Sequence, residues 1–129
     1  MDAKEIKKDG RFVLYDNGVV YDEVTRLEWI AGPDEDTTFQ EANDWVGDCA
    51  VAGGGWRLPE LKELRSLYED GKGCCNMTPL LKTTGGWLWS GKRKGSLFAW
   101  TFSFKYGREQ VDLKDISYLT RAFAVRAPK

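Results

Sequence analysis

Basic and aromatic side chains gather in two segments that could contact a ligand. The first, residues 91–96, carries Lys92, Arg93 and Lys94 between stretches rich in aromatic residues. The second, residues 105–118, contains Tyr106, Arg108 and Tyr118. Because Arg and Lys bind anions and an aromatic face can stack on the C–H surface of a sugar, both segments are candidates for binding a sulfated or carboxylated glycan. For each residue alone, a solvated turn is the simpler interpretation.

The chain contains no histidine, and this absence excludes several classes of catalytic site. Serine triads, cysteine–histidine dyads and histidine-based zinc sites cannot form. A pair of carboxylates could catalyse glycoside hydrolysis, and the chain has candidates in Asp34, Glu35, Asp36, Asp112 and Asp115. Their spacing singles out no pair, and acidic runs are usually solvated loops. We therefore expect a protein that is not an enzyme and has no cofactor.

Three cysteines are present, Cys49, Cys74 and Cys75, and no CxxC pair occurs. A zinc ribbon or a thioredoxin-type site is therefore absent, and we expect no metal site. The odd number leaves at least one thiol without a partner in the chain. Cys74 and Cys75 could form a vicinal bridge, or one of them could pair with Cys49. Alternatively, Cys49 is a small buried residue of the core.

Size and composition indicate one globular domain. The chain has 129 residues, 42% of them hydrophobic, and six tryptophans, which is enough for a core. A net charge of -1 gives no general attraction to nucleic acid, and no apolar run is long enough for membrane insertion. Residues 1–10 are polar and show no signal-peptide pattern. We expect them to be a tail before a single domain of residues 11–127.

The order of predicted elements is strands, two helices, then strands. An Asn-Gly turn at 17–18 should join strands at 12–15 and 19–21, and another strand should cover 27–30. Thr38 and Glu41 match a capping box before a helix over 39–49, and Pro59 suits the first turn of a second helix. Alternating aromatic residues predict strands around 87–89, 100–104 and 123–125. This order favours an α+β fold with an antiparallel sheet.

Six sequence segments occur in an order typical of a known family. They are DNGVVYDEVTRLEW (16–29), TFQEANDWVGDC (38–49), GGGWRLPELKELRSL (53–67), WLWS (87–90), AWTFSF (99–104) and RAFAVR (121–126). Over about residues 11–126 the chain resembles the Legionella collagen-like protein C-terminal domain family, and Trp-Arg-Leu-Pro followed by Glu-Leu is the most specific part. The resemblance implies a C-type-lectin-like α+β fold, with two helices packed on a mainly antiparallel sheet.

The resemblance also implies a role and a location. Family members are mostly exported or surface-attached, so an extracytoplasmic, lectin-like binding module for a glycan or another surface ligand is expected. A protein–protein interaction or scaffold domain is the alternative. Ala124 aligns with the family's second cysteine, so the disulfide expected from Cys49 cannot form here. The calcium-binding triplets of C-type lectins are absent, which argues against calcium-dependent sugar binding.

The motif of Trp56, Arg57, Leu58 and Pro59 is a family hallmark, and we interpret it as structural. Trp56 should fill the corner between the helices and the sheet, with Leu58 packed beneath it. Arg57 should pair with a carboxylate or with helix-end carbonyls. The inward stripes and hallmark positions further predict that four tryptophans are buried. These are Trp45, Trp56, Trp87 and Trp100.

Overall fold

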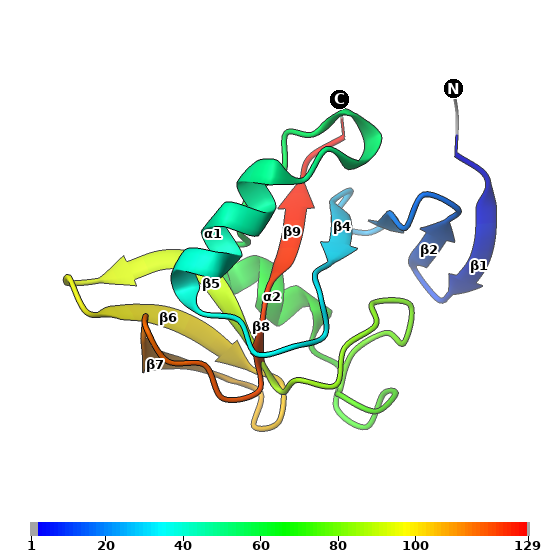
Figure 1. Cartoon of the computed structure of the whole chain (residues 1–129). Coiled ribbons are helices and arrows are strands. Elements are labelled where there is room, and N and C mark those ends of the chain that lie inside the picture. The colour runs from blue at the N-terminus through cyan, green and yellow to red at the C-terminus, as the bar shows by residue number, and fades with distance from the viewer. Residues whose placement is uncertain (1–2, 129) are drawn as a thin grey trace.

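Five strands form the first sheet, which runs in the order β1-β2-β3-β4-β9 and is antiparallel throughout. A computed structural model, which describes residues 3–128, shows this sheet at one side of the molecule (Figure 1). Its strands are β1 (Glu5–Asp9), β2 (Phe12–Tyr15), β3 (Val20–Asp22), β4 (Glu28–Ala31) and β9 (Phe123–Arg126). The predicted turn at Asn17 and Gly18 joins β2 to β3, as expected.

Four strands form the second sheet, in the order β7-β6-β5-β8. They are β5 (Trp87–Lys94), β6 (Phe98–Ser103), β7 (Arg108–Leu113) and β8 (Thr120–Arg121). Only the pairing of β8 with β5 is parallel in the described chain. The β5–β6 hairpin extends away from the rest of the domain (Figure 1). The predicted α+β class with mainly antiparallel strands is confirmed.

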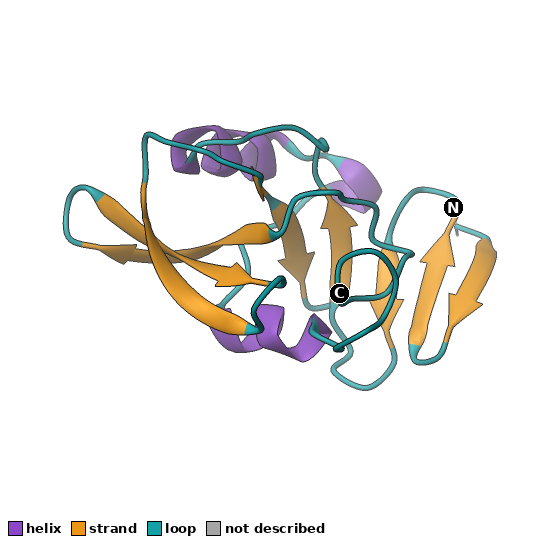
Figure 2. Ribbon diagram, turned by 90° about the horizontal axis from the view of Figure 1, so that it is seen from below, coloured by secondary structure: helices purple, strands orange, loops and turns teal. Residues whose placement is uncertain are grey.

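Helices α1 (Phe39–Asp48) and α2 (Leu61–Leu67) lie on opposite sides of the sheets (Figure 2), with a short 3-10 turn, η1 (Val51–Gly53), after α1. The capping box is present because Glu41 N–H donates to the Thr38 hydroxyl, and the Glu41 carboxylate accepts from Thr38 N–H. The predicted first helix is thus confirmed to within one residue at its end.

The start of α2 differs from the prediction. Pro59 lies before the N-cap residue, Glu60, instead of in the first helical turn. The side chain of Glu63 folds back and accepts a hydrogen bond of 2.8 Å from the Glu60 backbone N–H. The carboxylate therefore satisfies a helix-start donor, and the helix begins two residues after the proline.

The core has two parts that meet at β9. Phe123 and Val125 pack with Trp29, while the intervening Ala124 packs on the other side with Trp89. Because successive side chains of a strand point to opposite faces, β9 contributes to both clusters and is buried throughout. Strand β9 therefore packs against both clusters. Helix α2 contributes to the cluster that includes Phe123 and Val125, and helix α1 contributes to the cluster that includes Ala124.

Two expectations are wrong. Segment 1–10 is not simply a tail, because Glu5–Asp9 pairs with β2 as an edge strand. Of the four tryptophans expected in the core, Trp56 is buried as expected, whereas Trp45, Trp87 and Trp100 are only half-buried. Trp87 and Trp100 lie in the second sheet, where part of each face is open to solvent. The two tryptophans with no exposed surface are Trp29 and Trp89.

The cysteine alternatives are also decided by the fold. Cys74 and Cys75 form a vicinal disulfide, and Cys49 is free and half-buried. Cys49 lies at the end of α1, far in sequence from the loop that carries the other two. No helix within residues 3–128 has both the length and the apolar composition needed to cross a bilayer.

Candidate functional site

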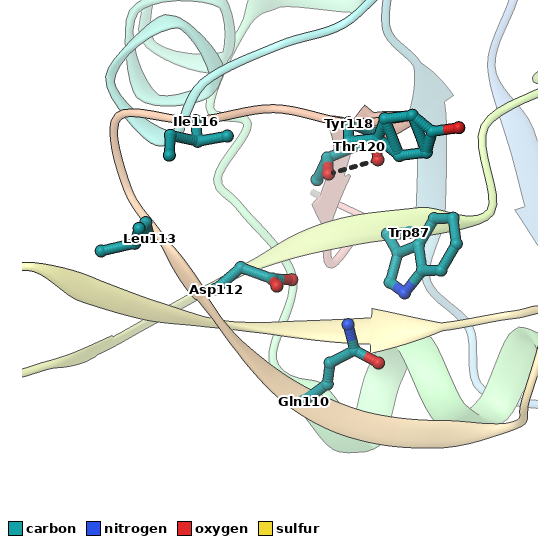
Figure 3. A pocket seen from close by; sticks show the side chains of 7 residues that line it. All are labelled: Trp87, Gln110, Asp112, Leu113, Ile116, Tyr118 and Thr120. Atoms are coloured by element: carbon teal, nitrogen blue, oxygen red, sulfur yellow. Dashed lines mark hydrogen bonds between the residues drawn. The ribbon is translucent and has the colours of Figure 1, made fainter.

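A pocket of about 260 Å³ opens on one face of the second sheet (Figure 3). Its walls come from β5, from β7, from β8 and from the loop of residues 114–119. The lining residues are Trp87, Gln110, Asp112, Leu113, Ile116, Tyr118 and Thr120. Trp87, Gln110 and Tyr118 lie at one end and Leu113 and Ile116 at the other, with Asp112 between them (Figure 3). The pocket thus combines an aromatic end, an apolar end and a polar centre.

Strand pairing brings these residues together from distant parts of the chain. In β7, Gln110 and Asp112 are two residues apart, so both point to the same face. Antiparallel pairing places Gln110 opposite Thr101 of β6, and Thr101 is opposite Trp89 of β5. Trp87 of β5 pairs in parallel with Thr120 of β8, and this pairing places Thr120 at the aromatic end of the pocket.

Polar groups of the pocket have free hydrogen-bonding capacity. One carboxylate oxygen of Asp112 accepts a hydrogen bond of 2.8 Å from the hydroxyl of buried Thr101; the other has no donor among residues 3–128. The indole N–H of Trp87 is buried and has no acceptor within the described chain. Since a carboxylate accepts and a primary amide both donates and accepts, Asp112 and Gln110 can bind a ligand rich in hydroxyl groups.

The wall formed by residues 114–119 is fixed from beneath. The Lys114 carbonyl accepts from Phe39 N–H at 3.0 Å, and the Ser117 hydroxyl accepts from Thr37 N–H at 2.9 Å. Leu119 N–H donates to the Asp36 carboxylate at 2.9 Å. The loop therefore has defined backbone contacts, while the Tyr118 side chain remains 72% exposed. The backbone of this wall is thus held in place, while the Tyr118 ring stays accessible to solvent.

Arg121 holds the end of this wall through two ion pairs. Its Nε lies 2.8 Å from Oδ1 of Asp34, and its Nη1 lies 2.9 Å from Oδ1 of Asp36. The hydrogen bond from Arg121, together with one from Thr84 N–H, lowers the pKa of Asp34 to about 2. The pair thus ties residues 34–36 to β8, and the carboxylate of Asp34 stays ionised at neutral pH.

Two further hollows lie near the pocket. Trp87 and Tyr118 also line a hollow of about 320 Å³, whose other side is formed by Cys74 and Cys75. The two cysteines in turn line a hollow of about 310 Å³ beside Asp34. The pocket shares Trp87 and Tyr118 with the first hollow, which in turn shares Cys74, Cys75 and Thr84 with the second. We call these three hollows the groove. Each alone is at the small end of ligand sites.

Residues 18–126 match the family model of the Lcl C-terminal domain. The chain belongs to the Lcl C-terminal domain family. The match includes every element from β3 to β9, and so the whole second sheet and the pocket. No curated protein matches the sequence.

The Trp-Arg-Leu-Pro motif of this Lcl C-terminal domain lies outside the groove. Trp56 is buried, and its indole N–H donates to the Val51 carbonyl at 2.8 Å. Both terminal nitrogens of Arg57 bind the Glu63 carboxylate at 2.8 Å, and this hydrogen bonding raises the pKa of Arg57. Burial opposes ionisation of Glu63, but its hydrogen bonds outweigh burial and lower its pKa. Through the Arg57–Glu63 pair, the motif holds the start of α2 against the residues that precede it.

The predicted basic residues do not form one loop. Lys92, Arg93 and Lys94 belong to β5 and point to both faces of the hairpin. The Nζ atoms of Lys92 and Lys94 each lie 5.5 Å from the Trp100 ring centre, and Arg93 Cζ lies 4.9 Å from that of Phe39. Trp100 and Thr101 point to opposite faces, so Lys92 and Lys94 are on the face opposite the pocket.

The other predicted residues lie at the opposite end of the hairpin. Tyr106 is in the β6–β7 turn, with Arg108 Cζ 5.1 Å from its ring centre. Arg108 pairs with Ser103, whereas Lys94 pairs with Phe98. Five residues of β6 separate these pairs, about 17 Å at about 3.3 Å per residue. Of the six predicted ligand-binding residues, only Tyr118 lines the pocket.

Three residues of the pocket are not among the ligand contacts predicted from the sequence. The sequence predicts that Trp87 lies in the core, because it is on an inward stripe or a hallmark position. Gln110 fell within the candidate range 105–118 but was not singled out, and Asp112 was noted only among many carboxylates. The usable signal was the alternation in Arg-Glu-Gln-Val-Asp-Leu at 108–113, which places Gln110 and Asp112 on one face. Within residues 3–128 no group of acidic or cysteine side chains has metal-binding geometry.

Proposed function

We propose that this domain is a non-catalytic glycan-binding module, and that the pocket around Trp87 and Tyr118 receives a sugar ring. The observation that carries the proposal is the combination of two aromatic side chains with an amide and a carboxylate in one solvent-open pocket. An aromatic face contacts the C–H surface of a sugar, while Gln110 and Asp112 bind its hydroxyls. Of the two segments predicted from the sequence, only 105–118 contributes to this proposed site; the basic residues 92–94 do not line the pocket.

The lining of the pocket argues against glycoside hydrolysis. That reaction uses two carboxyl groups on either side of the scissile bond. Asp112 is the single acidic residue among the seven that line the pocket, and one of its oxygens is already bound to Thr101. Binding without turnover is therefore the activity that the residue types favour.

We also propose an extracytoplasmic location, as the family resemblance implies. A vicinal disulfide is consistent with an oxidising compartment. A surface-attached or exported domain would meet glycans of the cell surface or its surroundings.

Isothermal titration calorimetry with neutral and anionic oligosaccharides tests the glycan proposal. The Tyr118→Ala variant should weaken binding about fivefold, because it removes an aromatic contact worth about 1 kcal/mol. Tyr106→Ala is the matched control, since Tyr106 is 55% exposed and lies outside the pocket. Equal effects of the two substitutions, or no heat of binding with any glycan, would refute the site. In the second case the protein–protein alternative would take its place.

A further inference from the structure

Exposed apolar side chains gather at the end of the β5–β6 hairpin. Leu97 and Phe98 are 61% and 38% exposed. Phe98 pairs directly with Leu113, and Lys114 N–H donates to the Leu97 carbonyl at 2.9 Å. Leu113 and Ile116 are exposed as well. We call Leu97, Phe98, Leu113 and Ile116 the apolar tip.

Four cationic side chains lie on the segments that carry the apolar tip. They are Lys92, Arg93, Lys94 and Lys114. None of them forms an ion pair within residues 3–128. Lys92 and Lys94 reach over the half-buried Trp100, while Arg93 and Lys114 reach toward Phe39. Asp112, which is bound to Thr101, and exposed Asp115 flank Leu113 and Lys114 in the sequence, and Lys92 shares a hollow with Glu60 and Glu109. Residues 91–98 themselves carry three cations and no carboxylate, on a chain of net charge -1.

The position of the hairpin makes this end accessible. All eight residues from 91 to 98 are exposed, and Figures 1 and 2 show the hairpin extending from the body of the domain. The apolar tip and its cations can thus reach a flat surface while the two sheets stay clear of it. Lys92, Lys94 and Trp100 are on the face opposite the sugar pocket, whereas Leu113 and Ile116 also line that pocket, so the two surfaces adjoin at these two residues.

From this arrangement we infer that the hairpin end docks on an anionic lipid surface. Leu97 and Phe98 would enter the headgroup region, where apolar side chains leave water, and Trp100 would lie at the interface that tryptophan favours. Lysine and arginine stems extend along the apolar surface while their charges bind lipid phosphates. A soluble polyanion would use the cations but would leave the apolar tip in water. This contact is interfacial and differs from the bilayer-spanning insertion that the sequence argues against.

Vesicle co-sedimentation tests the inference with phosphatidylcholine vesicles, with and without phosphatidylglycerol, at low and high salt. Binding should require the anionic lipid and should weaken with salt, because exposed charges are screened over about 8–10 Å at physiological ionic strength. Replacing Lys92, Arg93 and Lys94 with Ser should weaken binding about a hundredfold, at about fivefold for each charge. The Leu97→Ser, Phe98→Ser double variant should weaken it about tenfold or more.

The matched control is Ile6→Ser with Val24→Ser, because these apolar side chains are 61% and 69% exposed, in β1 and in the β3–β4 turn, away from the hairpin. It should bind vesicles as the unchanged protein does. All variants should keep their thermal midpoint, since surface substitutions away from packed side chains change stability little. Absence of vesicle binding overturns the inference. Loss of binding in the basic variant alone, with the Leu97/Phe98 variant unaffected and heparin bound equally well, would also overturn it in favour of a polyanion site.

Discussion

Replacing Arg121 with Met should destabilise the domain by about 2–3 kcal/mol at neutral pH. The Arg121 side chain is 7% exposed and makes two charged hydrogen bonds, to Asp34 and Asp36. Each such bond contributes about 1.5–3 kcal/mol. The carboxylate side chains are 39% and 57% exposed, so water can solvate them after the substitution. The loss should therefore fall below the 3–5 kcal/mol of a fully buried pair.

The same substitution should change the response to acid. The pKa of Asp34 is lowered to about 2 from 3.8, so its ionised form stabilises the fold above about pH 4. This stabilisation is lost as the pH falls from about 4 to 2. In Arg121→Met the main cause of the lowered pKa is removed, and the decline in stability over this pH interval should become shallower.

Urea denaturation at several pH values measures both effects. Lys8→Met is the control, because it removes the same charge from an exposed pair with Glu23 and should cost less than about 1 kcal/mol. An Arg121→Met protein that unfolds within 0.5 kcal/mol of the parent at neutral pH would refute the proposed role of the ion pairs. So would an unchanged dependence of stability on pH between 2 and 4.

Two further predictions concern packing. Trp56→Ala should cost about 3–5 kcal/mol in urea denaturation, because it empties a buried site and removes the hydrogen bond to Val51; an unchanged midpoint would contradict this. Gly85→Ala should cost at least about 2 kcal/mol, because its Cβ would lie 2.6 Å from the Leu119 carbonyl oxygen. Gly47→Ala, where a Cβ meets nothing within 4 Å in helix α1, should instead stabilise by about 0.5–1 kcal/mol. Thermal melts of the last two variants that shift in the same direction would refute the comparison.

Local signals were sufficient for the first helix and the first turns. Thr38 and Glu41 define the helix start through short-range hydrogen bonds, and the Asn17-Gly18 turn depends on its own residues. Strand β1 was missed because Glu-Ile-Lys-Lys-Asp at 5–9 has one apolar residue. Such a polar edge strand is held by pairing with β2 and by no buried face, so hydrophobic periodicity could not find it.

The candidate site depended on contacts between distant residues. Trp87 and Tyr118 are brought together by the parallel pairing of β5 with β8, which no pattern within either segment specifies. The basic run at 92–94 is visible in the sequence, but the sequence does not show that these residues extend the strand that begins at Trp87. Alternation along that strand separates Arg93 from Lys92 and Lys94 and directs them to different aromatic partners. The one predicted ligand residue in the pocket, Tyr118, follows from the combination of tyrosines and charged residues in segment 105–118.

The central claim is that the pocket around Trp87 and Tyr118 binds a glycan. A titration of the ¹⁵N-labelled domain with neutral and anionic oligosaccharides, followed by NMR, tests it most directly. The account predicts the largest shifts at the Trp87 indole N–H, the Gln110 side-chain amide and the backbone of residues 116–120, which line one pocket. Shifts concentrated at residues 92–94 with none at Trp87, or no shift with any oligosaccharide, would contradict it.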